Sequence, residues 1–109
     1  MQHYKTTLSK ILVLLTIGIV GLTATPPAAY AATITVNSTA DTATAGDGLC
    51  TLREAISNSN SDSDTTGGDC MAGSGIDTIA FAIGTVGSQQ TIAPASSLSS
   101  IGDPVFIDG

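Results

Sequence analysis

Apolar residues follow three different patterns along this chain. Residues 11–22 form a strongly apolar run, ILVLLTIGIVGL. Apolar and polar positions alternate, as in half-buried strands, in four later segments. These are Thr33–Asn37, Asp77–Ile83, Gln90–Ala93 and Pro104–Asp108. Glycines and prolines separate the last three, which begin at intervals of about 13 to 15 residues, so the pattern predicts short strands joined by turns.

Helical spacing of apolar residues occurs in the segment that starts at Cys50, CTLREAI. Thr51 and Glu54 match a capping box, in which the threonine oxygen accepts from the glutamate amide and the glutamate reaches back to the threonine amide. The following run SNSNSDSD has no apolar period and few helix formers. We therefore expect a helix of about two turns over roughly Leu52–Ser59.

The first 31 residues have the three parts of a secretory signal peptide. Lys5 and Lys10 give a positive beginning, the apolar run follows, and Ala29-Tyr30-Ala31 supplies a small-x-small cleavage site. Cleavage is expected before Ala32. The competing interpretation is a retained membrane anchor, but twelve apolar residues make only about 18 Å of helix against a hydrocarbon core of roughly 30 Å.

Removing the leader changes the composition of the remaining 78 residues. They contain one cation, Arg53, and all nine acidic residues, which leaves a net charge of −8. Such a charge argues against nucleic acid or an anionic membrane as a partner, and it suits an exported protein. The chain has few large apolar residues for its length. We therefore expect it to need a covalent link, a partner or more chain to be stable.

Cys50 and Cys70 are the two cysteines of the chain, and in an exported protein they are expected to form a disulfide. The bridge would enclose residues 51–69. A zinc site is the alternative, but thiolate zinc sites generally have four ligands, and the mature chain has no histidine to add.

Arg53 lies in the first turn of the expected helix, facing the positive end of the helix dipole. Another segment must therefore supply a favourable partner. We expect a structural ion pair with Asp41, Asp47 or Asp77 that ties the helix to the sheet. A catalytic arginine is the functional alternative.

Acidic residues concentrate in the loop after the expected helix, where Asp62, Asp64 and Asp69 are weak calcium candidates. The spacing does not fit an EF-hand. Counting from Asp62, the sixth position is glycine as required, but the twelfth is Gly73 where a glutamate belongs. A solvated loop is therefore the preferred interpretation, with a loose calcium site as the alternative.

Catalytic constellations are not evident in the mature chain. Its carboxylates include no distinguishable pair for glycoside hydrolysis, and serine hydrolase chemistry lacks a histidine. We expect no cofactor and no catalytic residue here. If the parent protein is an enzyme, its active site would lie downstream of Gly109.

The segment CTLREAI (Cys50–Ile56), with TITVNSTAD before it and GDCMAGSGIDTIAF after it, resembles the CSLREA domain of exported bacterial proteins. Thr51 stands where the family name has serine, which preserves the capping oxygen. Leu98–Gly109 is similar to the segment that leads into right-handed parallel β-helix repeats. The resemblance implies a mainly β fold with a short capping helix, in a secreted or cell-surface protein.

Two hypotheses follow for the function. The preferred one divides the chain into a signal peptide (1–31), a CSLREA-like cap (32–81) and the truncated start of a β-helix (82–109). This non-catalytic module would contact downstream β-helix rungs, and the whole protein would serve adhesion or surface interaction with glycans or proteins. The alternative is the leader segment of a secreted carbohydrate-active β-helix enzyme, either a polysaccharide lyase or a glycosidase.

Overall fold

The computed structural model of the protein describes residue 21 and residues 30–109. Within them lie, in chain order, β1 (Thr33–Val36), α1 (Leu52–Ser61), β2 (Asp77–Phe81) and β3 (Val105–Asp108). Most of the predicted signal peptide (residues 1–31), with the helix expected for its apolar run, lies outside the described residues. In the described part of the chain, no helix has the length and apolar character needed to cross a membrane.

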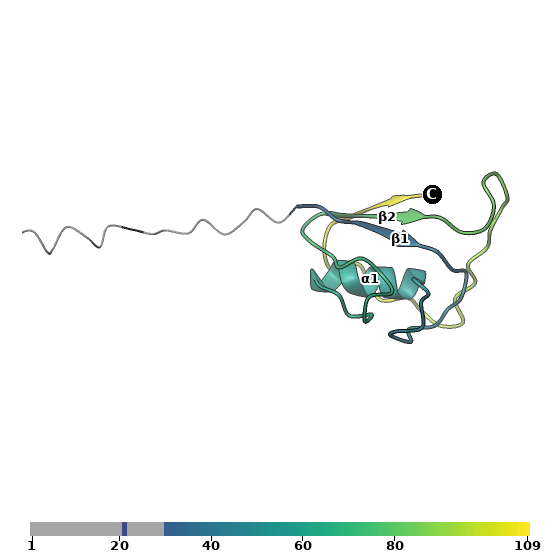
Figure 1. The fold of residues 1–109 in the computed structure, drawn as a ribbon, viewed down its shortest axis with the longest axis horizontal. Helices are drawn as coiled ribbons and strands as arrows, with labels where there is room; N and C mark the ends of the chain where they lie inside the picture. The colour runs from purple at the N-terminus through teal and green to yellow at the C-terminus, as the bar shows by residue number, and fades with distance from the viewer. Residues whose placement is uncertain (1–20, 22–29) are drawn as a thin grey trace, which may run out of the picture.

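The three strands form one sheet in which neighbouring strands run parallel (Figure 1). Their order in the sheet, β1-β2-β3, is their order in the chain. Each connection must therefore carry the chain from the C-terminal end of one strand back to the N-terminal end of the next, which a short hairpin turn does not do. Helix α1 lies in the first connection and packs against β1 and β2. The result is a small parallel sheet with one helix on one face.

The register of the sheet places three isoleucines in one row. Ile34 of β1 lies beside Ile79 of β2, which lies beside Ile107 of β3. Aligned positions of paired strands project to the same face of a sheet, here the face toward α1. Ile34 and Ile79 are fully buried, whereas Ile107 is 61% exposed. The helix therefore covers the first two members of the row and leaves the third uncovered.

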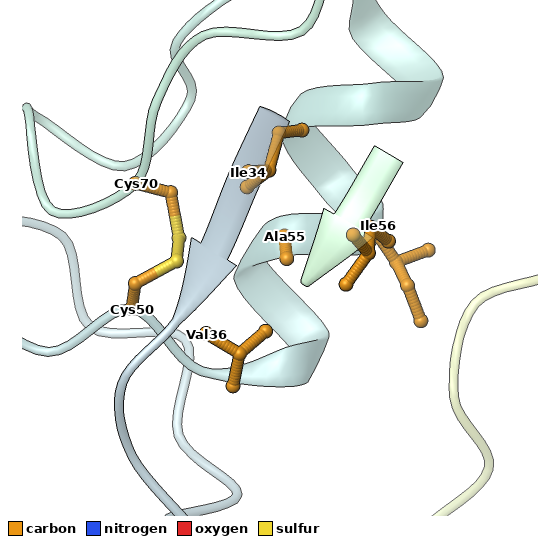
Figure 2. Packing of buried hydrophobic residues seen from close by; sticks show 7 residues of the cluster. Ile34, Val36, Cys50, Ala55, Ile56 and Cys70 are labelled. Carbon is orange, nitrogen blue, oxygen red and sulfur yellow. A yellow bond between two sulfur atoms is a disulfide. The ribbon is translucent and has the colours of Figure 1, made fainter. Parts of the chain in front are cut away.

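The buried apolar core combines side chains from β1, β2, α1 and both cysteines. Its members are Ile34, Val36, Cys50, Ala55, Ile56, Cys70 and Ile79. Figure 2 shows the two cysteines joined at one side of this cluster, with Ala55 between the strands and the helix. The apolar side chains that alternate along β1 and β2 thus pack against those at helical spacing in α1, as the sequence patterns predict.

Helix α1 begins at the predicted residue, Leu52, but ends at Ser61, two residues later than expected. Its C-cap residue, Asp62, has the left-handed conformation (φ 45°), and the Asp62 amide donates to the carbonyls of Asn58 and Ser59. The second half of the helix buries polar side chains instead of apolar ones. For that reason the spacing of apolar residues in the sequence could not show where the helix ends.

The expected strand at Gln90–Ala93 is wrong: the chain there is irregular, and the expected spacing of strands at about 13 to 15 residues does not hold. This segment leads into residues 95–97, where the Ala95 amide donates to Asp41 and the carbonyls of Ser96 and Ser97 accept from Arg53. No strand of the described chain pairs with it there. Ile92 still packs against the core. The alternation of apolar and polar residues in this segment therefore reflects partial burial without strand pairing.

Candidate functional site

The helical loop closed by the disulfide is the best-defined site in the structure. Cys50 and Cys70 are bonded, with their Cα atoms 4.9 Å apart, which confirms the predicted pairing. Both residues are buried, being 1% and 4% exposed. The bond joins the start of α1 to the end of the loop that follows α1, so it closes the loop over the core.

Asp69 forms a second link between the same two segments, which the sequence analysis missed. One carboxylate oxygen accepts from the amides of Gly46 (2.6 Å) and Asp47 (3.0 Å), and the other accepts from Gly48 (2.8 Å). Both glycines have positive φ values, 80° and 81°. Such a turn presents successive amides to one anion. The available signal was a Gly-Asp-Gly turn just before one cysteine and an aspartate directly before the other.

Thr51 occupies the N-cap of α1 and forms the capping box with Glu54. The Glu54 amide donates to Thr51 Oγ1 at 3.3 Å, and the Thr51 amide donates to Glu54 Oε2 at 3.1 Å. The threonine hydroxyl donates its one proton to the Thr42 carbonyl at 2.7 Å, a shorter contact than its 3.1 Å approach to Glu54. Thr51 therefore also attaches the helix to the preceding loop.

Arg53 pairs with Asp41, one of the three acids expected for it. Its Nη2 lies 2.7 Å and its Nε 3.0 Å from the same carboxylate oxygen. The guanidinium also donates to the carbonyls of Ser96 and Ser97. Asp41 in turn accepts from the Ala95 amide at 2.8 Å. The pair thus attaches α1 to residues 95–97, not to the sheet as expected.

The same contacts affect the protonation of Asp41. The Ala95 amide, and next the Arg53 guanidinium, hold the pKa of Asp41 below its usual value of 3.8. Because the folded protein favours the ionised carboxylate, this contribution to stability is complete well above pH 3.8. It is lost as the pH falls through the lower folded pKa.

We therefore expect Asp41→Asn to lower the free energy of unfolding at pH 6 by more than at pH 3, because below pH 3.8 the carboxyl of the unfolded chain is mostly protonated and part of the stabilisation by the folded carboxylate is lost. Urea unfolding at the two pH values measures this difference. Ser96→Ala is the control, because it removes an uncharged contact of Arg53 (3.2 Å) from the same cluster and its effect should not change with pH. A difference for Asp41→Asn that stays constant with pH would contradict this account.

Asn58 organises the loop after α1 from a fully buried position. Its amide nitrogen donates to the Met71 carbonyl at 3.0 Å and to the Cys70 carbonyl at 3.4 Å. Its oxygen accepts from both the amide and the hydroxyl of Thr65, at 2.7 and 2.8 Å. The sequence pattern gave no indication of this role, because a polar residue near the end of the expected helix has no apolar spacing that marks it as buried.

Asn60 plays a similar part on the more exposed side of α1. Its amide nitrogen donates to the Ser100 carbonyl at 2.9 Å, and its oxygen accepts from the Gly102 amide at 2.7 Å. These bonds hold the segment that leads into β3. The polar run at the end of the helix therefore joins segments that are about 40 residues apart.

The three calcium candidates have separate protein partners. Asp62 accepts from the Gly75 amide at 2.7 Å, and Asp69 holds the turn at residues 46–48. The Thr66 amide, then the Thr66 hydroxyl, keeps the pKa of Asp64 below its usual value. Among the described residues, no three acidic, histidine or cysteine side chains come together as a metal site would require.

An open apolar groove of about 680 Å³ lies where the chain leaves β2. Its walls include Phe81, Ile83, Val86 and Ile92, and Gly109 forms part of the rim. A smaller hollow of about 320 Å³ beside the capping box is lined by Arg53 and Glu54. The large groove has the size of a ligand pocket, but its lining includes no ionisable side chain.

A scan against models of protein families and searches of curated proteins and of solved structures found no match for this chain. The resemblance of Cys50–Ile56 and its flanks to the CSLREA domain therefore stays a prediction.

Proposed function

We propose that this chain is a non-catalytic N-terminal cap of a secreted or cell-surface β-helix protein that serves adhesion or another surface interaction. The observation that carries the proposal is the row of Ile34, Ile79 and Ile107 across a parallel sheet. α1 covers this row at β1 and leaves it uncovered at β3. A sheet whose apolar face is covered at β1 and β2 and uncovered at β3 suits a module that begins a stack of strands.

The open edge has the features that a further strand would cover. Within the described residues, the outer edge of β3 has no strand beside it. Phe106 and Ile107 are 67% and 61% exposed, on opposite faces of β3. An unpaired strand edge with apolar side chains is a template for another strand. In the proposed protein, the next rung of a right-handed parallel β-helix pairs with β3 and covers Ile107.

The chemistry of the helical loop also supports a structural role. Arg53, the one cation of the mature chain, is bound to Asp41 and to backbone carbonyls. Asp69 is bound by three backbone amides. These charged groups are thus used to hold segments of the chain together, which fits a scaffold better than a reaction centre.

We expect residues 32–109 alone to be less stable than the same residues followed by those that the gene encodes beyond Gly109. Each rung of a stack contacts only its neighbours, so the last rung lacks half of its core. Urea titration monitored by circular dichroism compares the two proteins, and the shorter one should unfold at lower urea with a broader transition. A gene that stops at Gly109, or equal stability of both proteins, would overturn the proposal.

A matched pair of variants tests whether the added stability of the longer protein comes from burial of side chains on β3. Ile107→Lys should cost about 2 kcal/mol in the longer protein, where the proposed rung buries this side chain, and little in the shorter one. Val86→Lys is the control, because Val86 is fully exposed on the loop after β2 and lies outside the row. Equal costs of Ile107→Lys in the two proteins would show that nothing covers Ile107.

A further inference from the structure

The two cysteine-bearing segments are joined twice, once covalently and once by hydrogen bonds. Asp69 is the residue before Cys70, and the three amides that it accepts from, those of residues 46–48, end two residues before Cys50. The Gly46 amide also lies 3.0 Å from the Thr66 carbonyl, within the enclosed loop. The non-covalent link therefore holds the two chain segments side by side next to the sulfur atoms.

The contacts of this link are non-covalent and involve neither sulfur atom. The three donors belong to consecutive residues, and the positive φ values of Gly46 and Gly48 turn their amides toward one point. An ionised carboxylate forms stronger hydrogen bonds to amides than a neutral group does. Asn58 independently binds the Cys70 carbonyl from inside α1. The position of Cys70 is thus set from two sides by non-covalent contacts.

We propose that Asp69 and the turn at residues 46–48 form a template that brings the Cys50 and Cys70 thiols together before they are oxidised. This inference does not depend on the capping function. Without such a template, two residues 20 apart in the chain would have to meet against the conformational entropy of the loop between them. With it, most of that entropy is already lost in the reduced protein. Asp69 is in this sense a positioning residue for disulfide formation.

The oxidation itself follows ordinary thiol–disulfide exchange with a small external disulfide, such as oxidised glutathione, as the oxidant. The thiolate of one cysteine attacks the external disulfide, forms a mixed disulfide and releases one glutathione thiolate, which takes up the proton. The second cysteine thiolate then attacks the protein sulfur of the mixed disulfide and displaces the second glutathione. Two protein thiols are oxidised and one glutathione disulfide is reduced to two thiols. The template acts on the second, intramolecular step.

The first test measures the equilibrium of the whole chain in glutathione redox buffers, which gives the effective concentration of the two thiols toward each other. Asp69→Asn should lower this concentration about tenfold, because the neutral amide loses the charge and one of the two acceptor oxygens. Asp108→Asn removes the same charge from the exposed end of β3 and should leave it unchanged. Equal values for the wild type and Asp69→Asn would overturn the proposal.

A second pair of variants changes the turn instead of the carboxylate. Gly48→Ala and Gly87→Ala both place a side chain at a positive φ, 81° and 83°, and neither new Cβ has an atom within 4 Å. Their backbone strain is therefore similar, but only Gly48 belongs to the template. Gly48→Ala should lower the effective concentration of the thiols, whereas Gly87→Ala should not. An equal decrease in both variants would assign the effect to general destabilisation and overturn the proposal.

A third measurement separates a template from a contact that forms only after oxidation. In the Cys50→Ser, Cys70→Ser double variant, the amides of residues 46–48 should keep slowed hydrogen exchange, and adding Asp69→Asn should remove it. Free exchange of these amides in the double variant would show that the turn closes on Asp69 only when the disulfide is present. That result would also overturn the proposal.

Discussion

Gly73→Ala should destabilise the protein strongly, although it adds only one methyl group. Gly73 is buried beside α1, and a Cβ atom there would come well inside van der Waals contact of the Asn58 carbonyl and 2.9 Å from the Asp77 carboxylate. The opposing carbonyl belongs to the helix backbone, so it cannot turn away as a flexible side chain can. Overpacking commonly costs about 1–3 kcal/mol, and we expect about 3 kcal/mol or more.

Urea unfolding of the disulfide-bonded protein measures this effect, with Gly102→Ala as the control. Gly102 also lies beside an asparagine, but its Cβ would meet only the side chain of Asn60, at 3.4 Å. This variant should change stability by less than about 1 kcal/mol, because surface substitutions without a clash have small effects. If the two alanine variants are equally stable, the close approach of residue 73 to α1 is wrong.

The second large effect is expected for Asn58→Ala. The substitution removes the donor to two backbone carbonyls and the acceptor for Thr65, in a residue with no exposed surface. Buried polar groups left without partners cost about 1–3 kcal/mol each, and solvent can compensate at Thr65, which is exposed. We therefore expect a loss of roughly 3 kcal/mol, measured by urea unfolding.

Asn60→Ala is the matched control on the same helix. Asn60 makes a comparable set of hydrogen bonds, to Ser100 and Gly102, but it is only half-buried. Water can replace these bonds, so the cost should be about 1 kcal/mol. Hydrogen exchange should also increase at Thr65 in Asn58→Ala and at Gly102 in Asn60→Ala. Equal stability losses in the two variants would contradict the central role of Asn58 in the loop.

The sequence by itself determined features formed by residues close together in the chain, and features for which few pairings of residues are possible. The capping box could be predicted because Thr51 and Glu54 are only three residues apart, so one helical turn brings them together. The disulfide could be predicted because the chain contains two cysteines and therefore one possible internal pair. The three strands that form were visible as alternation of apolar and polar residues, and in β1 and β2 the apolar face is the buried one.

Only the tertiary structure decided which distant groups meet. A partner for Arg53 was expected from its place in the helix dipole, but the choice of Asp41 depends on the path of the loop before Cys50. Gln90–Ala93 has the alternation of a strand and forms none, because a strand requires a neighbouring strand and no strand of the described chain pairs with this segment.

The roles of Asn58, Asp69 and Gly73 also depend entirely on tertiary contacts. In the sequence they are ordinary residues of a polar stretch, and most of their partners lie between 7 and 23 residues away. Hydrogen bonds between side chains and backbone have no period along the chain, unlike the burial of apolar residues in helices and strands. For that reason the sequence determined the apolar core and its elements, and the folded chain determined the polar contacts that hold the loop over that core.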